Sequence, residues 1–269
     1  MKRQKILWRP YLAELTGTAI LVMVGLSLVI FMVGTGSPMP AMIPDEGLRR
    51  VITGFLFGST GALIAISPVG KERGAHINPA VTLAFWLMGK IDSVVALGYI
   101  VAQLVGAVIG ALPLLAWGPI GRSISFGAAL PGQGYSLHTV FIGEVITTFT
   151  MVSLLITFLG FRNLRRYTPA IFPILYAVMV YVEAPISGTS TNPARSLGPA
   201  VISGAWPAWW IYWMGPFTGA LTATLTCSFL AKRIEVAKLY RFDSDRDGLF
   251  RRMGTRGTAE NKNQISAGT

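Results

Sequence analysis

The sequence predicts an all-α membrane protein with six membrane-crossing helices and two shorter re-entrant half-helices, arranged as an inverted repeat. Three observations predict it: a low content of charge, a series of long apolar segments, and two copies of the tripeptide Asn-Pro-Ala. Of the 269 residues, 52% are hydrophobic and only 13% are charged, against about 25% in soluble domains. A soluble globule of this composition could not cover its surface, and the single Cys excludes a disulfide scaffold.

Six apolar segments are long enough to cross a bilayer, which takes about 20 residues of helix. They are residues 12–33, 51–69, 94–117, 140–159, 170–186 and 208–231. The first segment is longer than the apolar part of a secretory signal peptide, so we expect it to span the membrane rather than be cleaved. The fifth is short and contains Glu183, so its boundary is the least defined.

Two further apolar pieces, residues 77–88 and 193–202, are too short to span a bilayer. Each could be a re-entrant segment or a surface loop with a chance apolar stretch. Both begin at the same Asn-Pro-Ala tripeptide, which favours the re-entrant interpretation.

The net charge of +11 raises the question of nucleic-acid binding, which is common in basic chains. With the N-terminus inside, 19 of the 23 basic residues fall on the cytoplasmic side. The other side keeps Arg49, Arg50, Arg122 and Arg195. Such a bias sets the orientation of a membrane protein. The charge therefore predicts a multi-pass protein with both termini in the cytoplasm and the lipid bilayer, not nucleic acid, as its surroundings.

The chain divides into two similar halves, at about residues 11–117 and 135–231. Each half has three spans and a short apolar piece between the second and third. Because three is an odd number, the halves must insert with opposite orientation, and such repeats place a site at the membrane midplane. We expect residues 1–10 to be a cytoplasmic N-terminus, 11–232 to be the membrane domain, and 233–269 to be a basic, disordered cytoplasmic tail.

Small residues recur at a spacing of four, which lets helices approach closely in lipid. The pairs are Gly54/Gly58, Gly106/Gly110 and Gly215/Gly219. We expect a packing role for them.

Glu14 and Glu144 occupy matching places in the first span of each half. An acid inside a span is read first as functional, and one interpretation is a pair of ion sites in a proton-coupled secondary transporter. With two separated His and one Cys, the chain cannot build a zinc site. No nucleophile–base pattern is present in the sequence either, so we expect no metal, no cofactor and no enzymatic activity.

The sequence resembles the aquaporin and major intrinsic protein family. The resemblance is carried by residues 76–82 (HINPAVT) and 187–196 (SGTSTNPARS), with support from 102–106 and 210–216, and covers roughly residues 8–232. The second motif looks most like the plant nodulin-type and related bacterial members. The resemblance implies an aquaporin-like bundle around a pore, a homotetramer with one channel per subunit, and a bacterial inner (plasma) membrane as the location.

The resemblance also assigns the pore motifs to Asn78, Pro79, Ala80, Asn192, Pro193 and Ala194. The prolines would occupy the first turn of each half-helix and the asparagines would cap it. Two positive helix ends would then face each other at the midplane and oppose cations. The amides would donate to a passing water and break the chain of hydrogen bonds that carries protons.

Irregular backbone precedes each motif, and at membrane depth it is tolerated where it lines a cavity. Its carbonyl groups would form a ladder of acceptors from Gly74, Ala75, His76, Ile77, Gly188, Thr189, Ser190 and Thr191. In this second interpretation, Glu14 and Glu144 accept hydrogen bonds from the re-entrant loops rather than bind a transported ion.

By alignment to the family, the constriction of the pore falls at Phe57, Val180, Thr189 and Arg195. Strict water channels usually have His where this chain has Val180, and glycerol channels usually have Asp where it has Ser196. We therefore expect a passive channel for water, with glycerol, urea or ammonia left open as further or main solutes. Glu183 could attract cations at the outer mouth, pair with Arg195, or lie solvated at a helix end.

Overall fold

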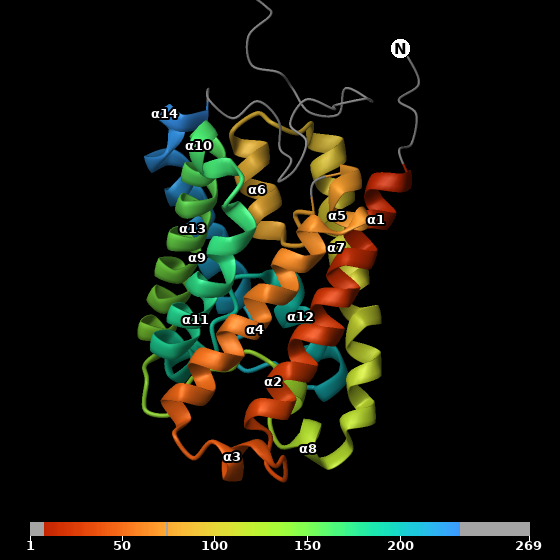
Figure 1. Ribbon diagram of the computed structural model, residues 1–269, viewed down its shortest axis with the longest axis vertical. Helices are drawn as coiled ribbons and strands as arrows, with labels where there is room; N and C mark the ends of the chain where they lie inside the picture. Colours follow the sequence, from red (N-terminus) through yellow and green to blue (C-terminus); the bar gives the residue numbers. More distant parts are fainter. Residues whose placement is uncertain (1–7, 74, 232–269) are drawn as a thin grey trace, which may run out of the picture.

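The computed structural model describes residues 8–73 and 75–231, which fold into a bundle of helices without strands (Figure 1). The basic tail and the first residues therefore lie outside the described residues. The first half of the chain forms α1 (Trp8–Ile20), η1 (Leu21–Gly25), α2 (Leu26–Val33), α3 (Met39–Met42), α4 (Glu46–Ile66), α5 (Pro68–Arg73), α6 (Pro79–Leu87), α7 (Ser93–Ala111) and η2 (Leu112–Trp117). The second half forms α8 (Gly118–Arg122), η3 (Ser125–Gly127), α9 (Leu137–Gly160), α10 (Arg162–Arg165), α11 (Thr168–Ser187), α12 (Pro193–Ser203), α13 (Ile211–Thr226) and α14 (Ser228–Ala231).

Five helical segments in the described residues are long and apolar enough to cross a membrane: Trp8–Val33, Glu46–Ile66, Ser93–Arg122, Leu137–Gly160 and Thr168–Ser187. They correspond to the first five predicted spans. The sixth predicted segment is also helical, but α13 has only 16 residues. It ends because the backbone leaves the helical region at Cys227, and a short helix, α14, follows.

The first span contains one wide π-helical turn, η1, between α1 and α2. Such turns insert a residue into an α-helix and are frequent at functional sites. Leu21 at the start of this turn is buried, and Gly25 at its end faces the ring of Phe57. The turn was not predicted from the sequence.

The glycine pairs pack helices together, as the sequence predicts. Gly54 and Gly58 of α4 lie against the backbone of Tyr176 and Phe172 in α11, where a Cβ on Gly58 would fall 2.6 Å from the Phe172 carbonyl oxygen. Gly106 and Gly110 likewise face the backbone of Leu15 and Ala19 in α1. In the second half Gly219 faces the backbone of Val145 in α9, and Gly215 faces the Cβ of Glu144.

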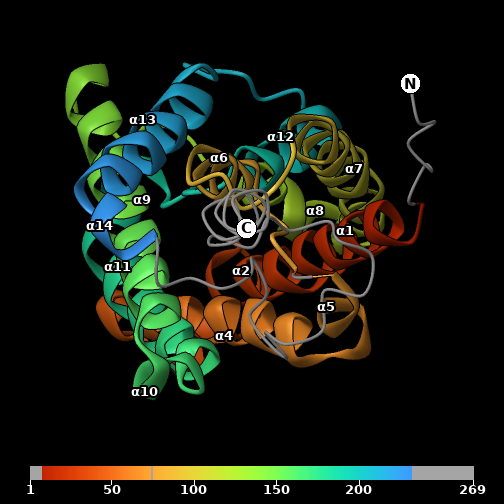
Figure 2. The same ribbon diagram turned by 90° about the horizontal axis from the view of Figure 1, so that it is seen from above.

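The two short helices α6 and α12 lie inside the ring made by the long ones (Figure 2). Helix α6 packs against α13 from the other half, and α12 packs against α7. Likewise α1 packs on α7 as α9 packs on α13, while α4 and α11 pack on each other. Helix α1 runs down the bundle from the end that carries α5 and α10, and α9 runs up from the end that carries α3 and α8 (Figure 1). The halves thus show the opposed arrangement expected of an inverted repeat.

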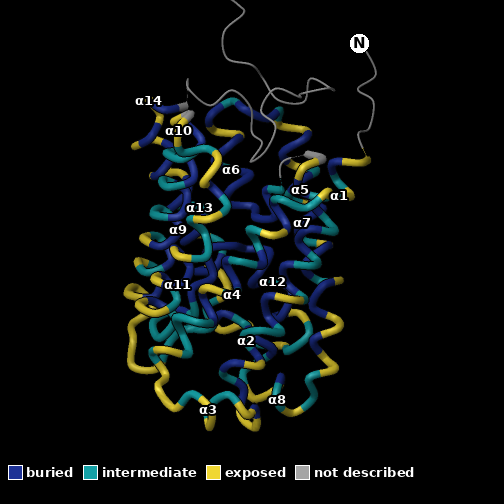
Figure 3. The backbone as a smooth tube through the Cα atoms, in the orientation of Figure 1, coloured by how far each residue is buried: buried dark blue, intermediate teal, exposed yellow. Residues whose placement is uncertain are grey.

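Burial separates the centre of the bundle from its outer surface (Figure 3). On α11, for example, Ile174, Val178 and Val182 follow at helical spacing and are each more than half exposed. An apolar outer stripe of this kind suits contact with lipid chains. Glu14, Glu144 and Arg195 are instead buried in the interior.

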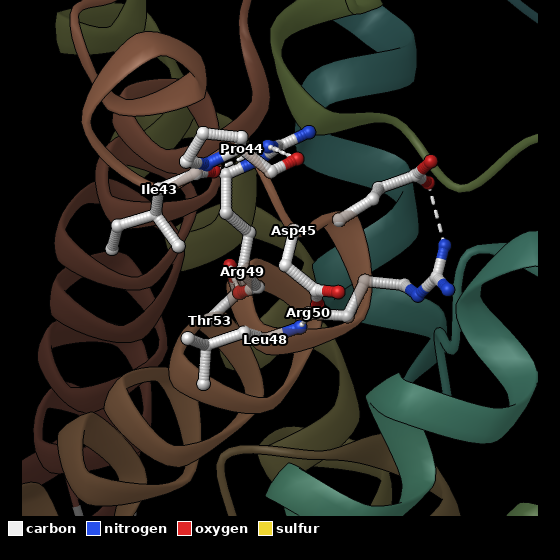
Figure 4. A network of polar contacts seen from close by, with 8 residues as sticks. Ile43, Pro44, Asp45, Leu48, Arg49, Arg50 and Thr53 are labelled. Carbon is white, nitrogen blue, oxygen red and sulfur yellow. Dashed lines mark hydrogen bonds and ion pairs between the residues drawn. The ribbon is translucent and has the colours of Figure 1, made fainter.

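A network of polar contacts fixes the start of α4 at the α3 end of the bundle (Figure 4). Asp45 caps the helix by accepting from the backbone nitrogen of Leu48 at 2.5 Å. The guanidinium of Arg49 donates to the carbonyl oxygens of Ile43 at 2.6 Å and of Pro44 at 3.0 Å. Arg50 forms an ion pair of 2.5 Å with Glu46 on the preceding turn.

Candidate pore

The two Asn-Pro-Ala motifs meet at the centre of the bundle. The side-chain nitrogen Nδ2 of Asn78 donates to the carbonyl oxygen of Thr191 at 2.9 Å. In return, Nδ2 of Asn192 donates to the carbonyl oxygen of Ile77 at 2.9 Å. Each motif is therefore tied to the residue that precedes the other motif.

Each asparagine also caps the half-helix that follows it, as predicted. Oδ1 of Asn78 accepts from the backbone nitrogen of Ala80 at 2.8 Å, and Oδ1 of Asn192 accepts from that of Ala194 at 3.0 Å. Proline occupies the first turn of both helices, where its missing N–H costs no hydrogen bond. The N-termini of α6 and α12 thus converge, and each carries the partial positive charge of a helix dipole.

The loops before the motifs have an unusual backbone. Ala75 and Ile77 in one loop, and Thr189 and Thr191 in the other, have φ between 43° and 51°, in the left-handed region that non-glycine residues rarely adopt. Such residues are kept in place only when their surroundings fix them. Gly188 also has a positive φ, of 84°. Gly74, the remaining predicted loop glycine, lies outside the described residues.

Glu14 holds the first loop in its unusual conformation through hydrogen bonds to the loop backbone. Its carboxylate is buried and accepts from the backbone nitrogens of His76 at 2.8 Å and Ile77 at 2.7 Å. Nε2 of Gln103 donates to the same carboxylate at 2.8 Å and also to the hydroxyl oxygen of Thr82 at 3.0 Å. One acid therefore holds the first loop to the outer helices.

Glu144 does the same for the second loop. Its carboxylate is buried and accepts from the backbone nitrogens of Ser190 at 2.7 Å and Thr191 at 2.9 Å. It also accepts from the hydroxyl of Ser187. With three donors on each carboxylate, the contacts favour the loop-supporting interpretation of both acids over that of transported-ion sites.

His76 contributes its side chain as well as its backbone. Its ring stacks on Phe85 with centroids 4.7 Å apart, and Nδ1 lies 3.1 Å from the hydroxyl oxygen of Thr82. Both His76 and Phe85 line a narrow cavity of about 80 Å³ that also reaches Asn78 and Asn192. We call it the narrow cavity; it extends from the motifs toward Ala62, Ala65 and Thr168, at the α5 end of the bundle.

A second, wide cavity of about 200 Å³ lies on the α3 side. All four residues aligned to the constriction line it, namely Phe57, Val180, Thr189 and Arg195. The structure thus brings together four residues from α4, α11, a loop and α12. Arg50 and Thr53 of α4 also line this cavity, and sequence reasoning missed them because it treated the charge of Arg50 only as a marker of orientation.

Arg195 lines the wide cavity and forms no ion pair with Glu183 among the described residues. Arg195 is buried, and its guanidinium carbon lies 5.9 Å from the centre of the Phe57 ring. Glu183 is only 4% exposed, so the solvated helix-end interpretation is wrong. The cause is that Glu183 faces inward against Gly143 of α9. In the described part of the chain no ion pair joins it to Arg195.

Tyr176 is the functional candidate that sequence reasoning missed most clearly. It lines both cavities, as does Phe57. The signal was available, since Tyr176 lies four residues, about one helical turn, before Val180 and so on the same face of α11.

Comparisons with known proteins agree with this arrangement. The sequence matches the family model described as Major intrinsic protein over residues 1–227. It is 31% identical over 225 residues to aquaporin Z of Photorhabdus laumondii, covering 79% of this chain and 93% of that protein. It is 35% identical over 202 residues to aquaporin-6 of Rattus norvegicus, covering 75% of this chain and 71% of that protein.

Among solved structures, the fold matches the X-ray structure of the aquaglyceroporin from Plasmodium falciparum with a TM-score of 0.64. The match covers 82% of this chain and 95% of that one at 19% identity, so it concerns the fold alone.

Proposed function

The chain belongs to the major intrinsic protein family of channels, and from this premise we propose that it conducts water passively across the membrane while excluding protons and ions. The observation that carries the proposal is the meeting of Asn78 and Asn192 at the wall of the narrow cavity, between two converging helix N-termini.

The amide of each asparagine has two N–H donors, and a backbone carbonyl accepts one of them. The second donor of each is available to the oxygen of a water in the cavity. A water held by two donors turns its own hydrogens away from the centre, so the hydrogen-bonded chain that carries protons is interrupted there. The two helix dipoles add an electrostatic barrier to hydronium and other cations.

The solute range depends on the wide cavity. Val180 provides no hydrogen-bond donor and leaves space, and Arg195 provides a fixed positive charge with several donors. This combination supports passage of water first; the second candidate function is a facilitator whose main solute is glycerol, urea or ammonia. The similar proteins are named as aquaporins and as an aquaglyceroporin, so their names do not choose between water and these other solutes.

The apolar helices and the family make the chain an integral multi-pass membrane protein. The proposal extends this to a bacterial inner membrane, a membrane domain over residues 11–232, and both termini in the cytoplasm, supported by the distribution of Lys and Arg. In this orientation the wide cavity faces the outside and the narrow cavity faces the cytoplasm. A homotetramer of independent channels is the assembly that we propose.

The test is light scattering from proteoliposomes after an osmotic step. We expect fast shrinkage with a low activation energy and without a pH gradient, well above that of empty liposomes. A matched blocked variant is Val180→Trp, which places a large ring in the wide cavity and should abolish the excess water flux. Saturable, pH-driven uptake without water flux would overturn the proposal in favour of a proton-coupled transporter that uses Glu14 and Glu144.

A further inference from the structure

Tyr176 lies at the boundary between the wide and the narrow cavity. It belongs to α11 and is 8% exposed, and among the residues that the structure describes only Phe57 also lines both cavities. The two rings lie with centroids 5.6 Å apart and planes inclined by 36°. An aromatic pair therefore separates the space around Arg195 from the space around the two asparagines.

The phenol group is anchored on the pore side. The hydroxyl of Thr191 donates to the carbonyl oxygen of Ser190 at 2.7 Å, so its oxygen is available to accept from Tyr176 at 2.9 Å. The phenol oxygen also lies 3.3 Å from the sulfur of Met151. Since the backbone nitrogen of Thr191 is held by Glu144 at 2.9 Å, the phenol is tied to the fixed part of the second loop.

Phe57 and Tyr176 are both closely packed against their neighbours. A Cβ on Gly25 would lie 2.7 Å from the ring of Phe57, so this ring already rests against the backbone of the first span. The backbone of Tyr176 rests against Gly54 of α4, where an added Cβ would lie 2.7 Å from the Tyr176 carbonyl carbon. Phe172 also stacks on Tyr176, with ring centroids 6.5 Å apart.

We propose that Tyr176 is a specificity-determining residue, which forms with Phe57 an aromatic waist that limits the cross-section of solutes between the two cavities. This inference rests on the proposed channel function and adds Tyr176, which lies one helical turn from Val180, to the residues that select solutes beside Phe57 and Arg195. At the waist a solute passes along the paired rings, which offer it an apolar wall, and loses hydrogen bonds to water. Water, the smallest solute, loses the least, so the waist favours water over glycerol and urea.

The experiment compares water and glycerol permeability in proteoliposomes that contain wild-type protein or Tyr176→Val. We expect the ratio of glycerol to water permeability to rise roughly fivefold, the factor for one additional hydrogen bond kept by the solute. Tyr176→Phe keeps the ring and should retain most of the discrimination. Val178→Ala, on the same helix but 59% exposed on its outer side, is the matched control and should leave the ratio unchanged.

Phe57→Leu removes the other ring of the pair and tests the same idea if Tyr176→Val does not fold. An unchanged ratio in a folded waist variant, or a Tyr176→Phe variant as permissive as Tyr176→Val, would overturn the inference. Failure of the underlying function is distinguishable, because wild-type protein would then give no water flux above empty liposomes.

Discussion

Asn78 and Asn192 hold each other's loops: each side-chain nitrogen donates, at 2.9 Å, to the carbonyl oxygen of the residue just before the other. The two re-entrant loops come from opposite halves of the chain, yet neither can move without disturbing the other. A substitution that removes the hydrogen bonds holding one loop should therefore also displace the other loop.

Replacing Glu144 by Leu tests this support. The change leaves the buried backbone nitrogens of Ser190 and Thr191 without their acceptor, at about 1–3 kcal/mol for each. We expect a large fall in the melting temperature of the purified protein in detergent, with Glu144→Gln intermediate because it keeps one acceptor oxygen. Glu14→Leu should act in the same way on His76 and Ile77.

The control for these variants is Glu46→Gln, which removes the carboxylate of an exposed ion pair with Arg50 and should change stability little. A Glu144→Leu protein with wild-type melting temperature would contradict the supporting role. If that protein also lost pH-driven uptake, Glu144 would be an ion site instead.

Gly54→Ala should destabilise the pairing of α4 with α11. The added methyl group would meet the backbone of Tyr176 and Ala177, which cannot give way as a flexible side chain could. We expect lower yield of folded protein and a melting temperature lowered by several degrees, as for overpacking by about 1–3 kcal/mol. Gly61→Ala is the matched control on the same helix, because its Cβ would have only one neighbour, at 4.0 Å on Leu21.

Val180→His narrows the wide cavity and adds a polar ring next to Arg195. We expect glycerol and urea permeability to fall more than water permeability, since water needs the smaller opening. Stopped-flow measurements of all three on the same proteoliposomes provide the check. Equal losses for water and solutes would remove Val180 from the constriction.

Lys90, in the loop between α6 and α7, gives a pH-dependent prediction. Burial, and secondarily the charge of Arg165, lowers the pKa of its ammonium from 10.5 to about 8. Between these two values the unfolded chain binds a proton that the folded protein has released, so stability should rise with pH in this window. Lys90→Met should flatten that rise in melting curves taken from pH 7 to 10, whereas the exposed Lys71→Met should retain it.

Much of the fold and part of the site could be predicted because they depend on local signals. Apolar length located the spans, and the two motifs located the half-helices and their caps. The face of α11 that carries Tyr176 could have been predicted from its spacing to Val180, but the burial of Glu183 depends on how α11 is rotated against α9, which the sequence does not specify. The short α13 and the wide turn η1 depend on the local backbone conformation, which cannot be predicted from the length of an apolar segment.

The wide turn η1 has a consequence for the whole first span. Before it, Glu14 faces the first loop; after it begins, Leu21 lines the narrow cavity and Gly25 rests on Phe57. A helix turns by about 100° for each residue, so deleting one residue from Leu21–Gly25 would rotate one of these faces away from its partner. This turn of five residues therefore fixes the direction in which Glu14 points relative to Gly25, so that Glu14 reaches the first loop while Gly25 contacts Phe57 of the aromatic waist.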